Sequence, residues 1–129
     1  MKKLIAVLLV SVFALTACGG SGGKVTNLNT TDFAAKASDP AVVVLDVRRP
    51  DEFAAGHLKN AVLLNYESGT FSEDITKLDK SKTYAVYCHS GRRSGLATSE
   101  MAKVGFNHVY NLDGGISGWM AAGQPVVNN

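Results

Sequence analysis

The feature that most constrains the fold is a series of short apolar runs separated by stretches with helical signals. Residues 41–47 are nearly all apolar and β-branched, which is typical of a strand covered on both faces of a sheet. Residues 61–64 are expected to form another buried strand, and further strands are expected at 25–28, 83–88 and 108–112. Strands that alternate with helices predict an α/β fold, with a mainly parallel central sheet flanked by helices on both faces.

Start and stop signals divide the stretches between these runs into helices. Pro50 suits a first helical position, and acidic residues follow it. Thr30 or Thr31 is expected to cap the first helix. Thr70 and Glu73 have the spacing of a capping box. The predicted helices are 30–37, 50–55, 70–78, 94–104 and a last one that follows Gly114-Gly115.

The N-terminus has the anatomy of a secretory signal. Lys2 and Lys3 precede an apolar run over residues 4–15, and small residues follow. The run is too short to span a bilayer comfortably as a permanent helix. The signal closes with Leu-Thr-Ala before Cys18, which resembles a bacterial lipobox. That resemblance implies cleavage before Cys18, lipid on its sulfur and acylation of the new N-terminus; the alternative is an ordinary signal peptide with an incidental cysteine.

This interpretation divides the chain into a signal peptide (1–17), a lipidated Cys18 with a flexible Gly-rich tether (18–23) and one folded domain (24–127). The mature protein is expected to be exported and lipid-anchored to a bacterial cell membrane. Gly19 is not the aspartate associated with inner-membrane retention, which favours the outer membrane where there is one. Of 13 Lys and Arg, two leave with the signal, so 11 face 11 Asp and Glu. A neutral body argues against nucleic acid as a partner.

Residues 84–94 hold the most informative chemistry. An apolar strand ends at Cys88, and a loop that contains Gly91 leads into the next helix. Loop N–H groups, the positive end of that helix and the guanidiniums of Arg92 and Arg93 all favour a thiolate. Ligands of parallel sheets sit beyond the carboxyl ends of the strands. We therefore expect an exposed, reactive thiol at Cys88 rather than a passive core thiol.

Loop length separates two chemistries that use such an anion cradle. Cysteine phosphatases typically place an arginine six positions after the cysteine, whereas sulfur transferases use a shorter loop. Arg93 is five positions after Cys88, and the sixth position is Ser94. The spacing favours sulfur transfer.

Three segments, in order, resemble the signatures of the rhodanese family, as a single-domain member. The first runs from Leu45-Asp46-Val47-Arg48 to Asn60-Ala61, the second is the Cys88 loop, and the third runs from Asn111 to Trp119. The likeness covers about residues 24–126. It implies a thiosulfate sulfurtransferase: the Cys88 thiolate takes the outer sulfur of thiosulfate or a similar small anionic donor, and the persulfide passes it to a thiophilic acceptor. The acceptor is cyanide in an assay and a thiol or a protein in the cell. No metal or organic cofactor is implied.

The same resemblance assigns roles around the catalytic Cys88. Arg92 and Arg93 would bind the donor's sulfonate oxygens, His89 would assist at the rim, and Ser94 would donate a hydrogen bond to the sulfur. The expected substrate-binding residues are His89, Ser90, Gly91, Arg92, Arg93 and Ser94.

Other polar residues are expected to be structural. Asp46 and Arg48 follow a strand and are predicted to form an ion pair that braces the site. His57 is expected to fix a turn and His108 to lie on the surface; three scattered histidines do not make a metal site. Two alternative functions stay open. One is a non-enzymatic persulfide carrier or interaction module, and the other is a cysteine phosphatase or arsenate-reductase-like enzyme.

Overall fold

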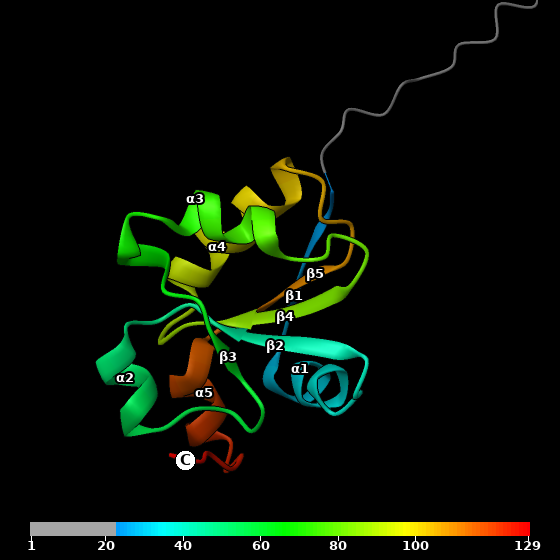
Figure 1. The fold of residues 1–129 in the computed structure, drawn as a ribbon. Coiled ribbons are helices and arrows are strands. Elements are labelled where there is room, and N and C mark those ends of the chain that lie inside the picture. The colour runs from blue at the N-terminus through cyan, green and yellow to red at the C-terminus, as the bar shows by residue number, and fades with distance from the viewer. Residues whose placement is uncertain (1–22) are drawn as a thin grey trace, which may run out of the picture.

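The computed structural model describes residues 23–129, so the predicted signal peptide and Cys18 lie outside the described residues. The described part contains one five-stranded sheet in the order β1-β5-β4-β2-β3, with every pairing parallel (Figure 1). The strands are β1 (Val25–Leu28), β2 (Val42–Asp46), β3 (Val62–Leu63), β4 (Thr83–Tyr87) and β5 (Val109–Leu112). The predicted α/β fold with a parallel sheet is confirmed.

Within residues 23–129, five α-helices and two short 3₁₀ helices lie between the strands or, in the case of the last helix, after them. They are α1 (Thr30–Ala37), α2 (Pro50–Ala55), η1 (Tyr66–Ser68), α3 (Phe71–Asp74), η2 (Ile75–Lys77), α4 (Arg92–Lys103) and α5 (Gly115–Ala121). Across residues 23–129, no helix combines the length and the apolar character needed to cross a membrane.

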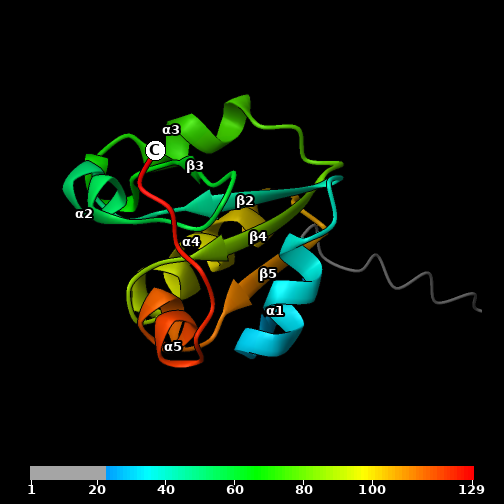
Figure 2. The ribbon, with the colours of Figure 1, turned by 90° about the horizontal axis from the view of Figure 1, so that it is seen from below.

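The side chains of β4 show how the sheet separates two apolar layers. Successive residues of a strand point to opposite faces. Tyr84, Val86 and Cys88 pack into a cluster with residues of α3 and α4, whereas Ala85 and Tyr87 pack with residues of α1 and α5. Figure 1 shows these two helix pairs on opposite sides of the sheet, and Figure 2 shows the molecule from the side of α1 and α5. Cys88 therefore belongs to the α4 side of the sheet.

The predicted buried strand at 61–64 is wrong in length and in burial. β3 has two residues and lies at the edge of the sheet, where it pairs with β2. The side chain of Val62 is 52% exposed. An edge strand has a neighbour on one side, so an apolar sequence there does not ensure coverage.

Two predicted helix caps are also wrong. Asn29, rather than Thr30 or Thr31, caps α1, and its Oδ1 accepts a 2.8 Å hydrogen bond from the N–H of Asp32. The Thr70 hydroxyl donates to the carboxylate of Asp74 at 2.9 Å instead of capping α3. That helix is one turn of α-helix followed by one turn of 3₁₀-helix.

Candidate active site

The loop after β4 encloses the sulfur of Cys88. Gly91 has a φ of +98°, a conformation that glycine adopts without the steric cost of a Cβ. This turn directs the N–H of Gly91 to Sγ of Cys88 at 3.1 Å. The hydroxyl of Ser94, in the first turn of α4, donates to the same sulfur at 3.3 Å. The helix begins at Arg92, two residues earlier than predicted, which places Ser94 and its backbone N–H in the first turn beside the sulfur.

The prediction that the thiol is exposed is wrong. The side chain of Cys88 has 0% exposure, because the loop folds over the sulfur and surrounds it with donors. Cys88 is free, without a disulfide partner in the part of the chain that the structure describes. Burial alone would also fit a passive core thiol. A passive core thiol, however, would not need several hydrogen-bond donors directed at its sulfur.

These donors determine the ionisation of the thiol. Burial by itself raises the pKa of Cys88, but hydrogen bonds from the Ser94 hydroxyl and from the N–H groups of Ser94, Gly91 and Ser90 lower it more. The net pKa therefore lies below the ordinary value of a cysteine. A larger share of Cys88 is thiolate at neutral pH than in a free cysteine, and the thiolate is the reactive form.

Replacing Ser94 with alanine should raise the pKa of Cys88, because the hydroxyl stabilises the charged form. The pH midpoint of thiolate formation, followed by its ultraviolet absorbance, should move upward. Below that midpoint the thiolate fraction at a given pH should fall. Ser90→Ala is the matched control, since Ser90 contributes its backbone N–H. An unchanged midpoint in Ser94→Ala would show that the hydroxyl does not stabilise the thiolate.

The start of α5 holds the loop in shape. The N–H of Ile116 donates to the carbonyl of Cys88 at 2.9 Å, and the N–H of Ser117 donates to the carbonyl of His89 at 3.1 Å. Gly115 has a φ of +61°, and a Cβ there would lie 2.3 Å from the His89 carbonyl oxygen. This close approach requires glycine. In the sequence, Gly114-Gly115 predicted only the start of a helix and not this close contact with the loop.

The predicted ion pair between Asp46 and Arg48 is confirmed. Arg48 donates from Nε and Nη2 to the carboxylate of Asp46, the shortest contact being 2.7 Å, and both residues are buried. Tyr87 also donates to this carboxylate at 2.5 Å, which sequence reasoning missed because β4 lies 41 residues away. Burial and the neighbouring Asp46 charge raise the pKa of Tyr87. Arg48 also donates to the carbonyl of Gly56 at 2.6 Å, so the cluster braces the loop after α2.

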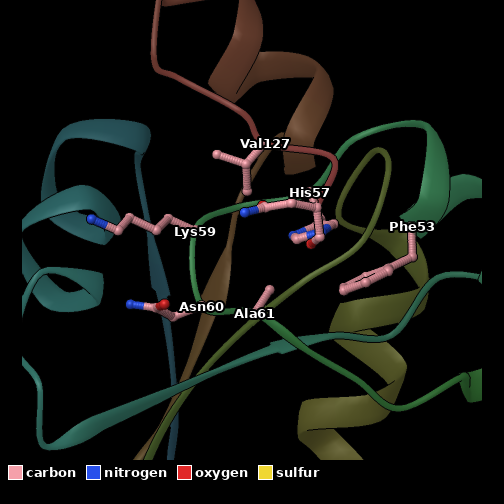
Figure 3. Close-up of a pocket in the computed structure, with 7 residues that line it drawn as sticks. Phe53, His57, Lys59, Asn60, Ala61 and Val127 are labelled. Carbon is pink, nitrogen blue, oxygen red and sulfur yellow. The ribbon is translucent and has the colours of Figure 1, made fainter.

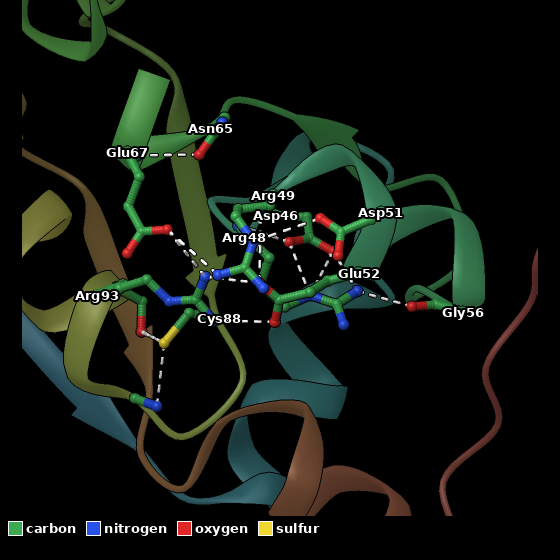
Figure 4. Close-up of polar contacts among 12 residues, drawn as sticks. Asp46, Arg48, Arg49, Asp51, Glu52, Gly56, Asn65, Glu67, Cys88 and Arg93 are labelled. Atoms are coloured by element: carbon green, nitrogen blue, oxygen red, sulfur yellow. Dashed lines mark hydrogen bonds and ion pairs between the residues drawn. The ribbon is translucent and has the colours of Figure 1, made fainter. Parts of the chain in front are cut away.

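The two arginines at the start of α4 have different surroundings. Arg92 is exposed. Arg93 donates to both oxygens of Glu52 on α2, at 2.7 and 3.0 Å, and lies 3.8 Å from Glu67 (Figure 4). The Arg93 hydrogen bonds lower the pKa of Glu52 to about 2. Sequence reasoning missed Glu52 as a site residue, and the role of Arg93 in donor binding stays a prediction.

His89 and Ser90 are exposed at the outer side of the loop. A cavity of about 350 Å³ lies beside His89, between α2, α5 and the C-terminal segment. Its lining residues are Arg48, Glu52, Ala55, Gly56, His89, Ile116, Met120 and Val126.

A second, larger cavity of about 570 Å³ lies at His57 and Val127 (Figure 3). The backbones of His57 and Val127 form an antiparallel bridge. The His57 ring stacks on Phe53 at 3.8 Å, and its nitrogens lie 3.0 Å from the Leu58 carbonyl and 3.1 Å from the Asn129 carbonyl. His57 is therefore structural, as expected, and it does not line the cavity beside His89. His108 is on the surface, also as expected. Within residues 23–129 no group of three His, Cys, Asp or Glu side chains could hold a metal ion.

Known proteins resemble this chain in sequence and in structure. The family model of the rhodanese-like domain matches residues 29–122 of this sequence. A tRNA uridine(34) hydroxylase from Buchnera aphidicola is 38% identical over 89 residues, which are 64% of this chain and 27% of that protein. The probable adenylyltransferase/sulfurtransferase MoeZ from Mycobacterium tuberculosis is 33% identical over 65% of this chain and 21% of its own length. The chain thus spans about a quarter of these curated relatives.

The crystal structure of a rhodanese-related protein from Thermoplasma volcanium has a TM-score of 0.72 and 33% identity, over 81% of this chain and 99% of that one. A protein from Rhodopseudomonas palustris described as a possible tyrosine phosphatase has a TM-score of 0.65 and 26% identity, over 80% of this chain and 85% of that one. The fold, the cysteine loop and the match over residues 29–122 agree, and this chain belongs to the rhodanese-like family.

Proposed function

We propose that this protein is a sulfurtransferase that moves a sulfane sulfur from thiosulfate or a similar donor to a thiophilic acceptor through a persulfide on Cys88. The observation that supports it most is the set of donors around one sulfur: the Gly91 N–H at 3.1 Å and the Ser94 hydroxyl at 3.3 Å. These donors stabilise a thiolate before the reaction and a persulfide anion after it.

The proposed step conserves atoms and charge. The Cys88 thiolate forms a bond to the outer sulfur of the donor, the S–S bond of the donor breaks, and sulfite leaves with the electron pair when the donor is thiosulfate. An acceptor thiol or cyanide then attacks the outer sulfur of the persulfide and releases the Cys88 thiolate. This chemistry uses no metal or organic cofactor.

The size of the loop favours this reaction over phosphoryl transfer. Arg93, in the first turn of α4, is five positions after Cys88, whereas a cysteine phosphatase typically places its arginine six positions after the cysteine. One structural neighbour of this chain is described as a possible tyrosine phosphatase. Turnover of para-nitrophenyl phosphate therefore tests the phosphatase alternative.

Intact-mass analysis after treatment with sulfane donors tests the proposal. We expect the protein to gain one sulfur atom and to lose it on addition of cyanide, with thiocyanate as the product. Release at catalytic rates would favour an enzyme, whereas a stable adduct that passes only to one protein partner would favour a persulfide carrier. No adduct with any sulfane donor would refute both.

We extend the proposal to the site of action. The lipobox-like segment before Cys18 supports an exported protein that is held at a bacterial membrane by lipid on Cys18. The donor is then a small sulfur compound outside the cytoplasm, and the acceptor is a thiol or a protein in the same compartment. The acceptor is a separate molecule, since the described domain offers no second cysteine to receive the sulfur.

A further inference from the structure

Basic residues are distributed unevenly between the two ends of the sheet. Within residues 23–129, the arginines follow the carboxyl ends of β2 and β4, and three of them pair with acidic side chains. Lysines gather instead where the strands begin. We call four of them the basic face: Lys24 before β1, Lys80 and Lys82 before β4, and Lys103 at the end of α4.

The start of the described chain lies against the end of α4. The N–H of Gly23 donates to the carbonyl of Ala102 at 2.7 Å. Lys24 and Lys103 each follow one of these two residues in the chain, so the hydrogen bond brings the two lysines to the same end of the sheet.

The lysines before β4 belong to the same end. The N–H of Tyr84 donates to the carbonyl of His108 at 2.9 Å, so the segment that leads into β4 lies beside the segment that leads into β5. The ammonium of Lys80 is 6.0 Å from the centre of the Phe106 ring, which is on that second segment. Figure 2 shows the amino ends of β2, β4 and β5 together, at the opposite end of the sheet from α2.

The basic face is exposed and largely uncompensated. All four lysine side chains are exposed, and none of them forms an ion pair within residues 23–129. Asp79 is next to Lys80, but its carboxylate accepts hydrogen bonds from the hydroxyl and the N–H of Ser81, at 2.6 and 2.9 Å. Val104, beside Lys103, is 42% exposed. Free ammonium groups around an exposed apolar side chain suit a surface of anionic lipid headgroups.

The chain that precedes the domain favours a membrane over an acidic protein as the partner. Residues 19–22 separate Cys18 from Gly23, and an extended chain of this length reaches no more than about 20 Å. Lipid on Cys18 would therefore hold the start of β1, with the lysines around it, close to the headgroups. Cys88 follows the carboxyl end of β4, about 20 Å from Lys82 along the strand.

We propose that the basic face docks on anionic phospholipids, so that the domain lies on the membrane with the amino ends of its strands and the Cys88 loop faces the solution. The inference rests on the proposed lipid anchor at Cys18 and adds the orientation of the domain. The anchor holds the protein at the membrane, and the lysines determine which end of the sheet meets it. Both substrates then reach Cys88 from the aqueous side.

Acetylation of lysines on vesicles tests this orientation. The purified full-length product, with its lipid, is inserted into vesicles of phosphatidylcholine or of equal parts phosphatidylcholine and phosphatidylglycerol, and a water-soluble amine reagent is added. Lys103 should react at least about tenfold more slowly on the anionic vesicles, because several lysines each strengthen docking. Lys59, exposed on the loop between α2 and β3, should react equally on both. High salt should abolish the difference, since it screens the charges.

One substitution within the basic face and one outside it sharpen the test. Lys82→Gln should lower the protection of Lys103 on anionic vesicles roughly fivefold, the contribution of one lysine near such a surface. Lys59→Gln removes the same charge elsewhere and should leave that protection unchanged. The unfolding transition of each variant should match the wild type, because both side chains are exposed.

The possible results separate the basic face, the anchor and the sulfur transfer. Equal acetylation of Lys103 on both kinds of vesicle would overturn the membrane as the partner and favour an acidic protein. An equal loss of protection in Lys59→Gln would show that net charge attracts the protein, which overturns the proposal as well. Absence of lipid on Cys18 would refute the anchor, and the same ratio, measured with protein added to preformed vesicles, would still decide whether the face docks. Sulfur uptake by Cys88, followed by intact mass, is independent of these results.

Discussion

Cys88→Ser should abolish sulfur transfer, with a loss in kcat/KM on the order of a thousandfold or more, as for removal of other enzymic nucleophiles. The reason lies in the ionisation of the side chain. Hydrogen-bond donors lower the pKa of the Cys88 thiol, so that it reacts as a thiolate. A serine hydroxyl at the same place stays protonated at neutral pH. The measurement is thiocyanate formation from a sulfane donor and cyanide, together with the intact mass after donor treatment.

The other cysteine provides the control. Cys18→Ser leaves the loop untouched and should keep both sulfur uptake and turnover in the purified protein. The unfolding transition of Cys88→Ser should show that the domain still folds, because serine fills nearly the same volume and can accept the Gly91 hydrogen bond. A sulfur adduct that persists in Cys88→Ser would place the chemistry on another residue and end the proposal.

Asp46→Ala should lower the free energy of unfolding by about 3–5 kcal/mol, the cost of breaking a buried ion pair from one side. The substitution leaves the guanidinium of Arg48 and the hydroxyl of Tyr87 without their acceptor in a place that water hardly reaches. Unfolding in urea, followed by circular dichroism, measures the change. Complete loss of the folded state would agree with a decrease in the free energy of unfolding at the upper end of this range.

Asp51→Ala is the matched control, because Asp51 also pairs with an arginine but its side chain is 73% exposed. Its effect should stay within about 1 kcal/mol. Asp46→Ala combined with Arg48→Met should recover part of the loss, since no buried charge is then left alone. An Asp46→Ala change as small as that of Asp51→Ala would show that water compensates the buried arginine.

The sequence predicted those parts of the site that depend on local signals. The apolar, β-branched runs predicted the strands, and the glycine after Cys88 predicted the tight turn of the loop. Asp46 with Arg48 was identified as an ion pair because the two residues lie close in the chain, whereas the donor role of Ser94 was implied by the family resemblance of the loop. Such signals need no knowledge of how distant elements pack.

The errors and omissions concern packing between distant segments. The burial of Cys88 depends on α5, whose N–H groups hold the loop from 28 residues further along the chain. The pairing of Glu52 with Arg93 spans 41 residues. The exposure of Val62 follows from the place of β3 at the sheet edge, which a strand pattern does not reveal. The cap of α1 was missed because Asn29 is followed by two threonines, and all three residues are suitable N-caps by type.

The burial of the thiol also hinders a disulfide between two copies of the protein. A disulfide between two copies would need their Cβ atoms about 3.8 Å apart. With Cys88 at 0% exposure beneath its loop, two folded domains would collide before their sulfurs could meet. A sulfane donor is much smaller than a folded domain, so the recess favours sulfur exchange over covalent dimerisation in oxidising surroundings.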